Sequence, residues 1–223
     1  MDLHFDEEVI IPVTGVELKG ELVIPTGASS IVIFSHGSGS SRKSPRNLMV
    51  AHYLHQKGFG TLLFDLLSEV EDRYYSNRFD IDLLTERLIG ATQWLEQQPA
   101  ANNCRLGFFG ASTGAASALR AAKYLPQIGA VVSRGGRPDL AMGDLPKVKA
   151  PTILIVGGLD YDVLELNQKA YQQLQCEKKL EVVDGASHLF EERGMMEKVC
   201  AIAAAWFEKW LQPLRDTASL KRK

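Results

Sequence analysis

The chain has 223 residues, of which 45% are hydrophobic, and its formal net charge is −2. A chain of this size can bury a large core in one domain. A charge this close to zero gives no electrostatic reason to expect nucleic acid or a membrane surface as the main partner. Three widely spaced cysteines, at positions 104, 176 and 200, match neither a disulfide framework nor a zinc-ligand pattern.

The start of the chain is acidic and lacks the basic and apolar regions of a signal peptide. No apolar run approaches the roughly 18 residues that a membrane span needs. We therefore expect a cytoplasmic protein that does not enter the membrane.

The first third of the chain predicts a hairpin followed by alternating strands and helices. Residues 8–24 form two strand-like segments around a Thr-Gly turn, which predicts an antiparallel hairpin at a sheet edge. Residues 31–34 are apolar and mostly β-branched, as is typical of a strand buried on both faces. We expect a helix over residues 48–57 and another buried strand over residues 61–64.

The same alternation continues to the last helix. Asp80 is placed to cap a helix whose apolar positions keep helical spacing up to residue 95. Further strands are expected near 106–109, 128–133, 152–156 and 180–183, and a helix is expected after each of them except the strand at 128–133. This order predicts a mostly parallel sheet with helices on both faces. We expect one α/β domain over residues 1–212 and a polar, flexible tail over residues 213–223.

The segment Gly110-Ala111-Ser112-Thr113-Gly114 stands between an apolar run and an alanine-rich run. This G-x-S-x-G pattern predicts a sharp strand-to-helix turn with Ser112 at its apex. The two glycines, which have no β-carbon, allow strand and helix to approach closely around a strained serine. The free N–H groups of the new helix would face developing negative charge. We therefore predict that Ser112 is a nucleophile.

Two further residues complete a candidate triad with Ser112. Asp160 and His188 each follow an apolar strand, and functional groups of such sheets gather at the carboxyl ends of the strands. The order serine, acid, histidine is typical of α/β hydrolases. Spacings of 48 residues from serine to acid and 28 from acid to histidine each leave room for one strand and one helix. An imidazole would take the serine proton, and a carboxylate would fix its tautomer.

Both partners of the serine have competitors. Asp162 could be the acid, and Asp160 could cap the helix that follows, but Asp160 comes directly after the Gly-Gly that ends its strand. His188 is favoured because it is the histidine that follows the last predicted strand. The other histidines are His4, His36, His52 and His55. We interpret His36 as bracing its own loop by hydrogen bonds.

Backbone and arginine groups complete the predicted site. We expect the backbone N–H groups of Thr113 and Ser38 to form an oxyanion hole. Four arginines follow strands whose ends should open on the same edge: Arg42, Arg46, Arg134 and Arg137. One alternative is that they pair with Asp65, Asp139, Glu191 and Glu192 and tie loops together. The other is that Arg137, and with it Arg134, binds substrate and selects an anionic ester or lactone.

Four motifs together carry a family resemblance: S-H-G-S-G-S from residue 35, G-A-S-T-G from 110, V-G-G-L-D from 156 and G-A-S-H-L-F from 185. They resemble the dienelactone-hydrolase-like branch of the α/β-hydrolase superfamily over about residues 23–210. The resemblance implies the α/β-hydrolase fold, the triad Ser112, Asp160 and His188, and hydrolysis of an ester-like bond without a cofactor or metal. Dienelactone hydrolases proper are known for a cysteine nucleophile, so the serine favours a general carboxylesterase activity.

Some domains of this branch are fused to a phosphoribosyltransferase. A chain of 223 residues leaves no room for that second domain, and no phosphoribosyl-binding signature is visible. Residues 134–150, where larger α/β hydrolases insert a lid, number only 17. This predicts a minimal cap, an open cleft and a small substrate.

We therefore expect a serine hydrolase that cleaves a small carboxylic ester or lactone through an acyl-enzyme on Ser112. Peptidase or acyl-transfer activity with the same triad is one alternative. A non-catalytic binding module of the same fold is another, because fold and function are separable.

Overall fold

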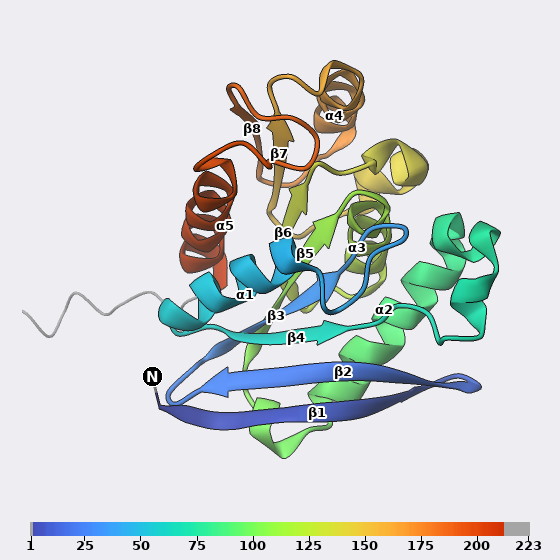
Figure 1. Cartoon of the computed structure of the whole chain (residues 1–223), viewed down its shortest axis with the longest axis vertical. Coiled ribbons are helices and arrows are strands. Elements are labelled where there is room, and N and C mark those ends of the chain that lie inside the picture. Colours follow the sequence, from blue (N-terminus) through green and yellow to red (C-terminus); the bar gives the residue numbers. More distant parts are fainter. Residues whose placement is uncertain (1, 212–223) are drawn as a thin grey trace, which may run out of the picture.

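The computed structural model describes residues 2–211, which form one eight-stranded sheet covered by helices (Figure 1). The strands are β1 (Leu3–Val13), β2 (Val16–Pro25), β3 (Ser30–Ser35), β4 (Gly60–Phe64), β5 (Arg105–Ala111), β6 (Ile128–Arg134), β7 (Thr152–Gly157) and β8 (Lys178–Val183). The α-helices are α1 (Pro45–Gln56), α2 (Ile81–Glu96), α3 (Thr113–Tyr124), α4 (Tyr161–Gln173) and α5 (Met195–Leu211). The expected tail over residues 213–223 lies outside the described residues.

The strands lie in the order β1-β2-β4-β3-β5-β6-β7-β8. β1 and β2 form the antiparallel hairpin at one edge, turning at Gly15 with a φ of +77°. β2 is antiparallel to β4, and from β4 to β8 every neighbouring pair is parallel. The predicted sheet is confirmed, with the difference that the hairpin begins at Leu3 rather than near residue 8.

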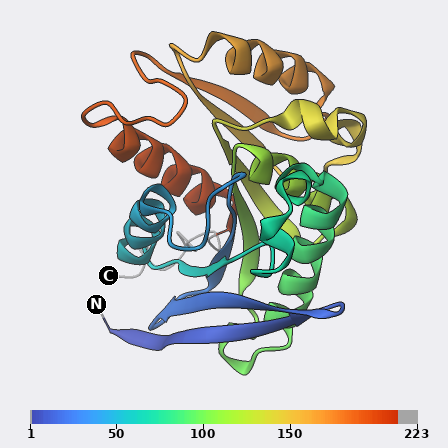
Figure 2. The ribbon, with the colours of Figure 1, turned by 45° about the vertical axis from the view of Figure 1, so that its right-hand side comes forward.

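Helices cover both faces of the sheet (Figures 1 and 2). α1 and α5 pack on one face, and α2, α3 and α4 pack on the other. All six residues of β3 are buried. Because successive strand residues point to opposite faces, Ile31 and Ile33 enter the core beneath α2 and α3, whereas Val32 and Phe34 enter the core beneath α1 and α5.

Two connections near the carboxyl edge contain short 3₁₀ helices that the sequence patterns did not predict. Between β4 and α2 the chain forms η1 (Glu71–Arg73) and η2 (Tyr75–Phe79). Between β6 and β7 it forms η4 (Pro138–Lys147), which packs against α3 and α4. The segment that we expected to form a minimal cap, residues 134–150, therefore contains a 3₁₀ helix that packs on α3 and α4.

Buried histidines make folding sensitive to acid. His55 on α1 lies with its Nε2 2.7 Å from Thr61 Oγ1. Burial, and then repulsion from His52, lowers the pKa of His55 to about 4. Burial also lowers the pKa of His36. Folding therefore favours the neutral form of both rings.

We expect stability to fall as the pH drops below the unfolded-state pKa of about 6.5. The unfolded chain then binds protons that the folded chain excludes, which costs up to about 1.4 kcal/mol per pH unit for each such histidine. For His55 the window runs from about pH 6.5 down to its folded pKa of about 4. Urea unfolding at pH 7, 6 and 5 measures the slope. His55→Gln should give a shallower slope, and an unchanged slope would show that His55 does not contribute.

Candidate active site

Ser112 occupies a strained turn between β5 and α3. Its φ is +52° and its ψ is −122°, a left-handed region that residues with a side chain seldom adopt. The glycines on either side explain how the turn fits. A β-carbon on Gly114 would lie 2.1 Å from the Ser35 carbonyl oxygen, and one on Gly110 would lie 2.5 Å from Ala115 Cα. Both positions therefore require glycine for the strand, the turn and the helix to meet.

The turn is held by the backbone at the end of β6. The Ser112 N–H donates to the Arg134 carbonyl at 3.2 Å. The Ser112 carbonyl accepts from the N–H groups of Ala115, at 3.1 Å, and Arg137, at 3.0 Å. The serine is thus fixed from both sides of the turn before any substrate binds.

Asp160 and His188 form a close pair. Asp160 Oδ2 lies 2.6 Å from His188 Nδ1, and 14% of the Asp160 side chain is exposed. Asp160 occupies the N-cap position of α4, yet its side chain makes no capping hydrogen bond. Asp162 lies in the exposed first turn of α4. Of the two aspartates that the sequence left open, the structure therefore brings Asp160 to the histidine.

A close approach of two loops produces this pair. A β-carbon on Gly157, at the end of β7, would lie 2.4 Å from the Ala186 carbonyl oxygen and 2.5 Å from that of Ser187. The Ala186 carbonyl also accepts the Leu159 N–H at 2.9 Å. Because the two backbones touch, the residues that follow them, Asp160 and His188, face each other.

The loop that carries His188 is anchored on its other side. The Ser187 N–H donates to both carboxylate oxygens of Glu192 at 3.1 Å. Hydrogen bonding from the Ser187 side chain, and then from the backbone N–H groups of Glu192 and Ser187, holds the pKa of Glu192 below its usual range. Phe190 is 1% exposed and packs in the core beneath α1 and α5, with a φ of +57°. The imidazole is therefore presented by a rigid loop.

Gly135 links the serine to the histidine. It follows Arg134, whose carbonyl holds the Ser112 N–H, and its own φ is +52°. A β-carbon on Gly135 would lie 3.6 Å from His188 Cε1. The end of β6 thus lies between the serine turn and the imidazole, so Ser112, Asp160 and His188 gather at one edge of the sheet. Such a set can transfer a proton from a hydroxyl to an imidazole that a carboxylate orients.

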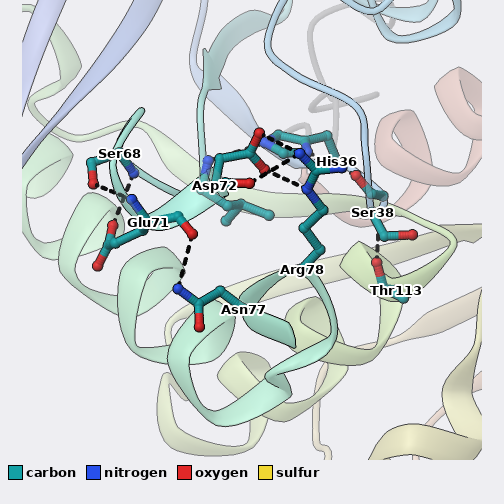
Figure 3. A network of polar contacts seen from close by, with 10 residues as sticks. His36, Ser38, Ser68, Glu71, Asp72, Asn77, Arg78 and Thr113 are labelled. Atoms are coloured by element: carbon teal, nitrogen blue, oxygen red, sulfur yellow. Dashed lines mark hydrogen bonds and ion pairs between the residues drawn. The ribbon is translucent and has the colours of Figure 1, made fainter. Parts of the chain in front are cut away.

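The two predicted oxyanion donors differ in availability. Thr113 is the first residue of α3, where a backbone N–H has no partner within the helix. The Ser38 N–H, in contrast, already donates to Thr113 Oγ1 at 2.9 Å (Figure 3). The Ser38 N–H, which the sequence predicts as an oxyanion donor, therefore has an acceptor in the threonine side chain, and its role in catalysis stays a prediction.

His36 braces the loop that contains Ser38. Its Nδ1 lies 3.0 Å from the Gly37 carbonyl oxygen, and its Nε2 lies 3.0 Å from the Leu66 backbone N. Since the backbone N–H must donate to Nε2, the proton of the neutral ring is on Nδ1. This agrees with the interpretation of His36 from the sequence. Asp72 and Arg78 pair beside it at 2.9 Å (Figure 3).

Three of the four arginines form ion pairs with the acids that the first alternative named. These pairs are Arg42 with Asp65, Arg46 with Glu191 at 3.1 Å, and Arg137 with Asp139 at 2.8 Å through two parallel hydrogen bonds. The first two pairs join separate loops, whereas Arg137 and Asp139 pair within one segment. The Arg137 side chain remains 38% exposed, so the pairing does not bury it.

Arg134 is the exception. It is only 5% exposed, and its Nη2 lies 3.5 Å from Asn47 Oδ1 in the first turn of α1. Burial, and then the nearby Arg46 guanidinium, lowers the pKa of Arg134 to about 10. The side chain points into the layer beneath α1. This corrects the expectation that Arg134 opens on a cleft, because side chains of a strand alternate and residue 134 falls on the α1 face.

Residues 18–215 match the model of the dienelactone hydrolase family. The chain belongs to this family. The crystal structure of dienelactone hydrolase from Anabaena variabilis superposes with a TM-score of 0.91 and 51% identity, covering 95% of this chain and all of that one. Est1E from Butyrivibrio proteoclasticus superposes with a TM-score of 0.78 at 14% identity, covering 91% of this chain and 98% of that one, which shows the shared fold.

A longer relative of this family member comes from Mycobacterium tuberculosis and bears the name "Putative phosphoribosyl transferase". The two are 53% identical over 203 residues, which is 91% of this chain but 46% of the relative. The chain thus spans about half the length of the curated relative. The comparisons establish a hydrolase family and the α/β-hydrolase fold.

Residues 2–211 of this family member lack two further features. No helix in that range is long and apolar enough to cross a membrane. The same range holds no group of three or more histidine, cysteine or acidic side chains arranged to bind a metal ion.

Proposed function

We propose that this dienelactone hydrolase family member is a serine hydrolase that cleaves a small carboxylic ester or lactone through an acyl-enzyme on Ser112. The observation that carries the proposal is the 2.6 Å contact between Asp160 Oδ2 and His188 Nδ1 at the edge of the sheet where the strained Ser112 turn lies. Ester hydrolysis needs a nucleophile, a base and an oriented carboxylate in such proximity.

In the acylation step, Ser112 Oγ attacks the ester carbonyl carbon while His188 Nε2 takes the hydroxyl proton. Asp160 accepts the hydrogen bond from His188 Nδ1 and stabilises the imidazolium that forms. Negative charge then develops on the carbonyl oxygen, close to the start of α3, where the helix dipole and the Thr113 N–H stabilise it. His188 gives its proton to the alkoxide leaving group, and the C–O bond to that group breaks.

In the deacylation step, His188 takes a proton from a water molecule, and the resulting hydroxide attacks the acyl carbon. The bond between that carbon and Ser112 Oγ breaks, and the serine recovers its proton from His188. The carboxylic acid leaves as product. With a lactone substrate the leaving hydroxyl stays joined to the acid, so one hydroxy acid is released.

Phosphoribosyl transfer, which the name of the longer relative suggests, is a less direct assignment. The match covers 46% of that relative, so its name need not describe the matched half. This chain carries the strained serine turn and the Asp160–His188 pair, which favour acyl chemistry. We therefore propose hydrolysis rather than phosphoribosyl transfer for this chain.

The test combines labelling with substrate profiling. The purified protein should react covalently with a fluorophosphonate at Ser112. Among p-nitrophenyl esters it should prefer short acyl chains, because the segment over β6–β7 is short. Amide substrates and added acceptor alcohols should show whether peptidase or acyl-transfer activity competes. A protein that neither labels nor turns over any ester would contradict the proposal and favour a binding module.

Arg137 provides a separate test of substrate charge. Its guanidinium is 38% exposed and is shared with Asp139, so a substrate carboxylate would have to compete for it. If Arg137 selects an anionic ester, Arg137→Met should cost that substrate about 1.5–3 kcal/mol more in kcat/KM than its neutral analogue. The measurement is kcat/KM for both esters with both proteins. Equal losses would mean that Arg137 only forms its local ion pair with Asp139.

A further inference from the structure

The Thr113 side chain belongs to the same residue as the backbone N–H that would stabilise the oxyanion of the proposed reaction. Thr113 directly follows Ser112, begins α3 and is 2% exposed. Its Oγ1 accepts the Ser38 N–H at 2.9 Å (Figure 3). A hydroxyl that accepts one hydrogen bond still has its own proton to donate. Thr113 can therefore offer two donors on one residue, the backbone N–H and the side-chain O–H.

The loop that contains Ser38 is tightly packed, so a reorientation of the Ser38 N–H would cost free energy. A β-carbon on Gly37 would lie 3.0 Å from Ser112 Cβ and 3.2 Å from the Ala111 carbonyl oxygen. On its other side, His36 binds both the Gly37 carbonyl and the Leu66 N–H, each at 3.0 Å. Turning the Ser38 N–H directly towards a substrate would break its bond to Thr113 and disturb this packing.

We propose, on the basis of the hydrolase function above, that the Thr113 hydroxyl is itself a catalytic donor to the oxyanion. The Ser38 N–H acts one step behind it. By donating to Thr113 Oγ1, the amide orients the hydroxyl and makes its proton a stronger donor, since hydrogen bonds in a chain polarise one another. The carbonyl oxygen of the substrate then receives the Thr113 N–H and the Thr113 O–H as its negative charge develops.

A pair of variants tests the hydroxyl. Thr113→Val keeps the shape and removes the O–H, whereas Thr113→Ser keeps the O–H and removes a methyl group. We expect Thr113→Val to lower kcat for p-nitrophenyl acetate by about 10²-fold, the loss typical of one oxyanion donor. KM should change less than about twofold, and Thr113→Ser should retain kcat within about threefold, because a contact made mainly in the transition state affects kcat.

A transition-state analogue separates this role from a structural one. Ser112 Oγ adds to the carbonyl carbon of a trifluoromethyl ketone, and the serine proton goes to His188. The former carbonyl oxygen then carries a negative charge. The Ki of the ketone should rise in Thr113→Val by the same factor by which kcat/KM falls. A structural role would lower the melting temperature without this proportionality. Should the valine variant not fold, Thr113→Ala gives the same comparison with less steric demand.

The results that would overturn the proposal are specific. If the Ser38 N–H were the direct donor and the threonine only masked it, Thr113→Val would keep or raise kcat. Equal losses in the valine and serine variants would likewise exclude the hydroxyl as the donor. Fluorophosphonate labelling of the unaltered protein separates this failure from that of the proposed function. If the unaltered protein is labelled at Ser112 and Thr113→Val keeps its full kcat, the proposed hydrolase function stands and only the proposed role of Thr113 is rejected.

Discussion

Replacement of Ser112 by alanine should abolish both ester turnover and fluorophosphonate labelling while leaving the fold intact. The hydroxyl is the group that forms the acyl-enzyme, so no other side chain can take over its bond to the acyl carbon. In other serine hydrolases the loss of the nucleophile costs up to about 10⁶-fold in kcat. Kinetics with a short p-nitrophenyl ester, together with a circular dichroism spectrum, measure both parts of this result.

Removal of the hydroxyl should leave the turn folded because the bonds that hold it come from the backbone. The Ser112 N–H and carbonyl make hydrogen bonds to Arg134, Ala115 and Arg137. Ser41→Ala is a matched control, since the Ser41 hydroxyl lies in the preceding loop and accepts only a local N–H from Lys43 in the described structure. That control should label normally. Labelling that persists in Ser112→Ala would identify a different nucleophile.

The fold could be predicted because its main determinants are local. Buried parallel strands such as β3 consist of continuous apolar residues, and the G-x-S-x-G pattern has few other uses between a strand and a helix. η1 and η2 were not predicted, because a segment of mixed polarity with three exposed aromatic residues, Tyr74, Tyr75 and Phe79, has no helical or strand period. Such a segment takes its shape from contacts with the rest of the fold, such as the pair between Glu71 and Arg87 on α2.

The sequence predicts which candidate site residues follow the strands, but it does not predict the individual hydrogen bonds between them. The order along the chain placed Ser112, Asp160 and His188 after their strands. No sequence pattern states that Thr113 Oγ1 accepts the Ser38 N–H, since the two residues are 75 positions apart. Arg134 was misplaced for a related reason. Its position at the end of β6 was correct, but the side of the sheet on which it falls depends on the register of the strand.

The sequence left open whether Asp160 or Asp162 is the acid of the triad. Because Asp160 pairs with His188, we expect its replacement to have the larger effect on activity. Asp160→Asn should lower kcat by about 10⁴-fold, as for the equivalent change in other triads. The Asn amide can donate to His188 Nδ1, which moves the imidazole proton to Nε2. An Nε2 that carries a proton can no longer accept one from Ser112.

Asp162→Asn is the matched control for this variant, because the two changes have the same chemistry two residues apart. Asp162 is exposed in the first turn of α4 and there interacts mainly with the helix dipole. Its replacement should therefore cost up to about 1 kcal/mol of stability and leave kcat nearly unchanged. Measurement of kcat and of the melting temperature for both variants separates the two roles. A loss of activity in the reverse order would make Asp162 the acid and reduce Asp160 to a residue at the start of the helix.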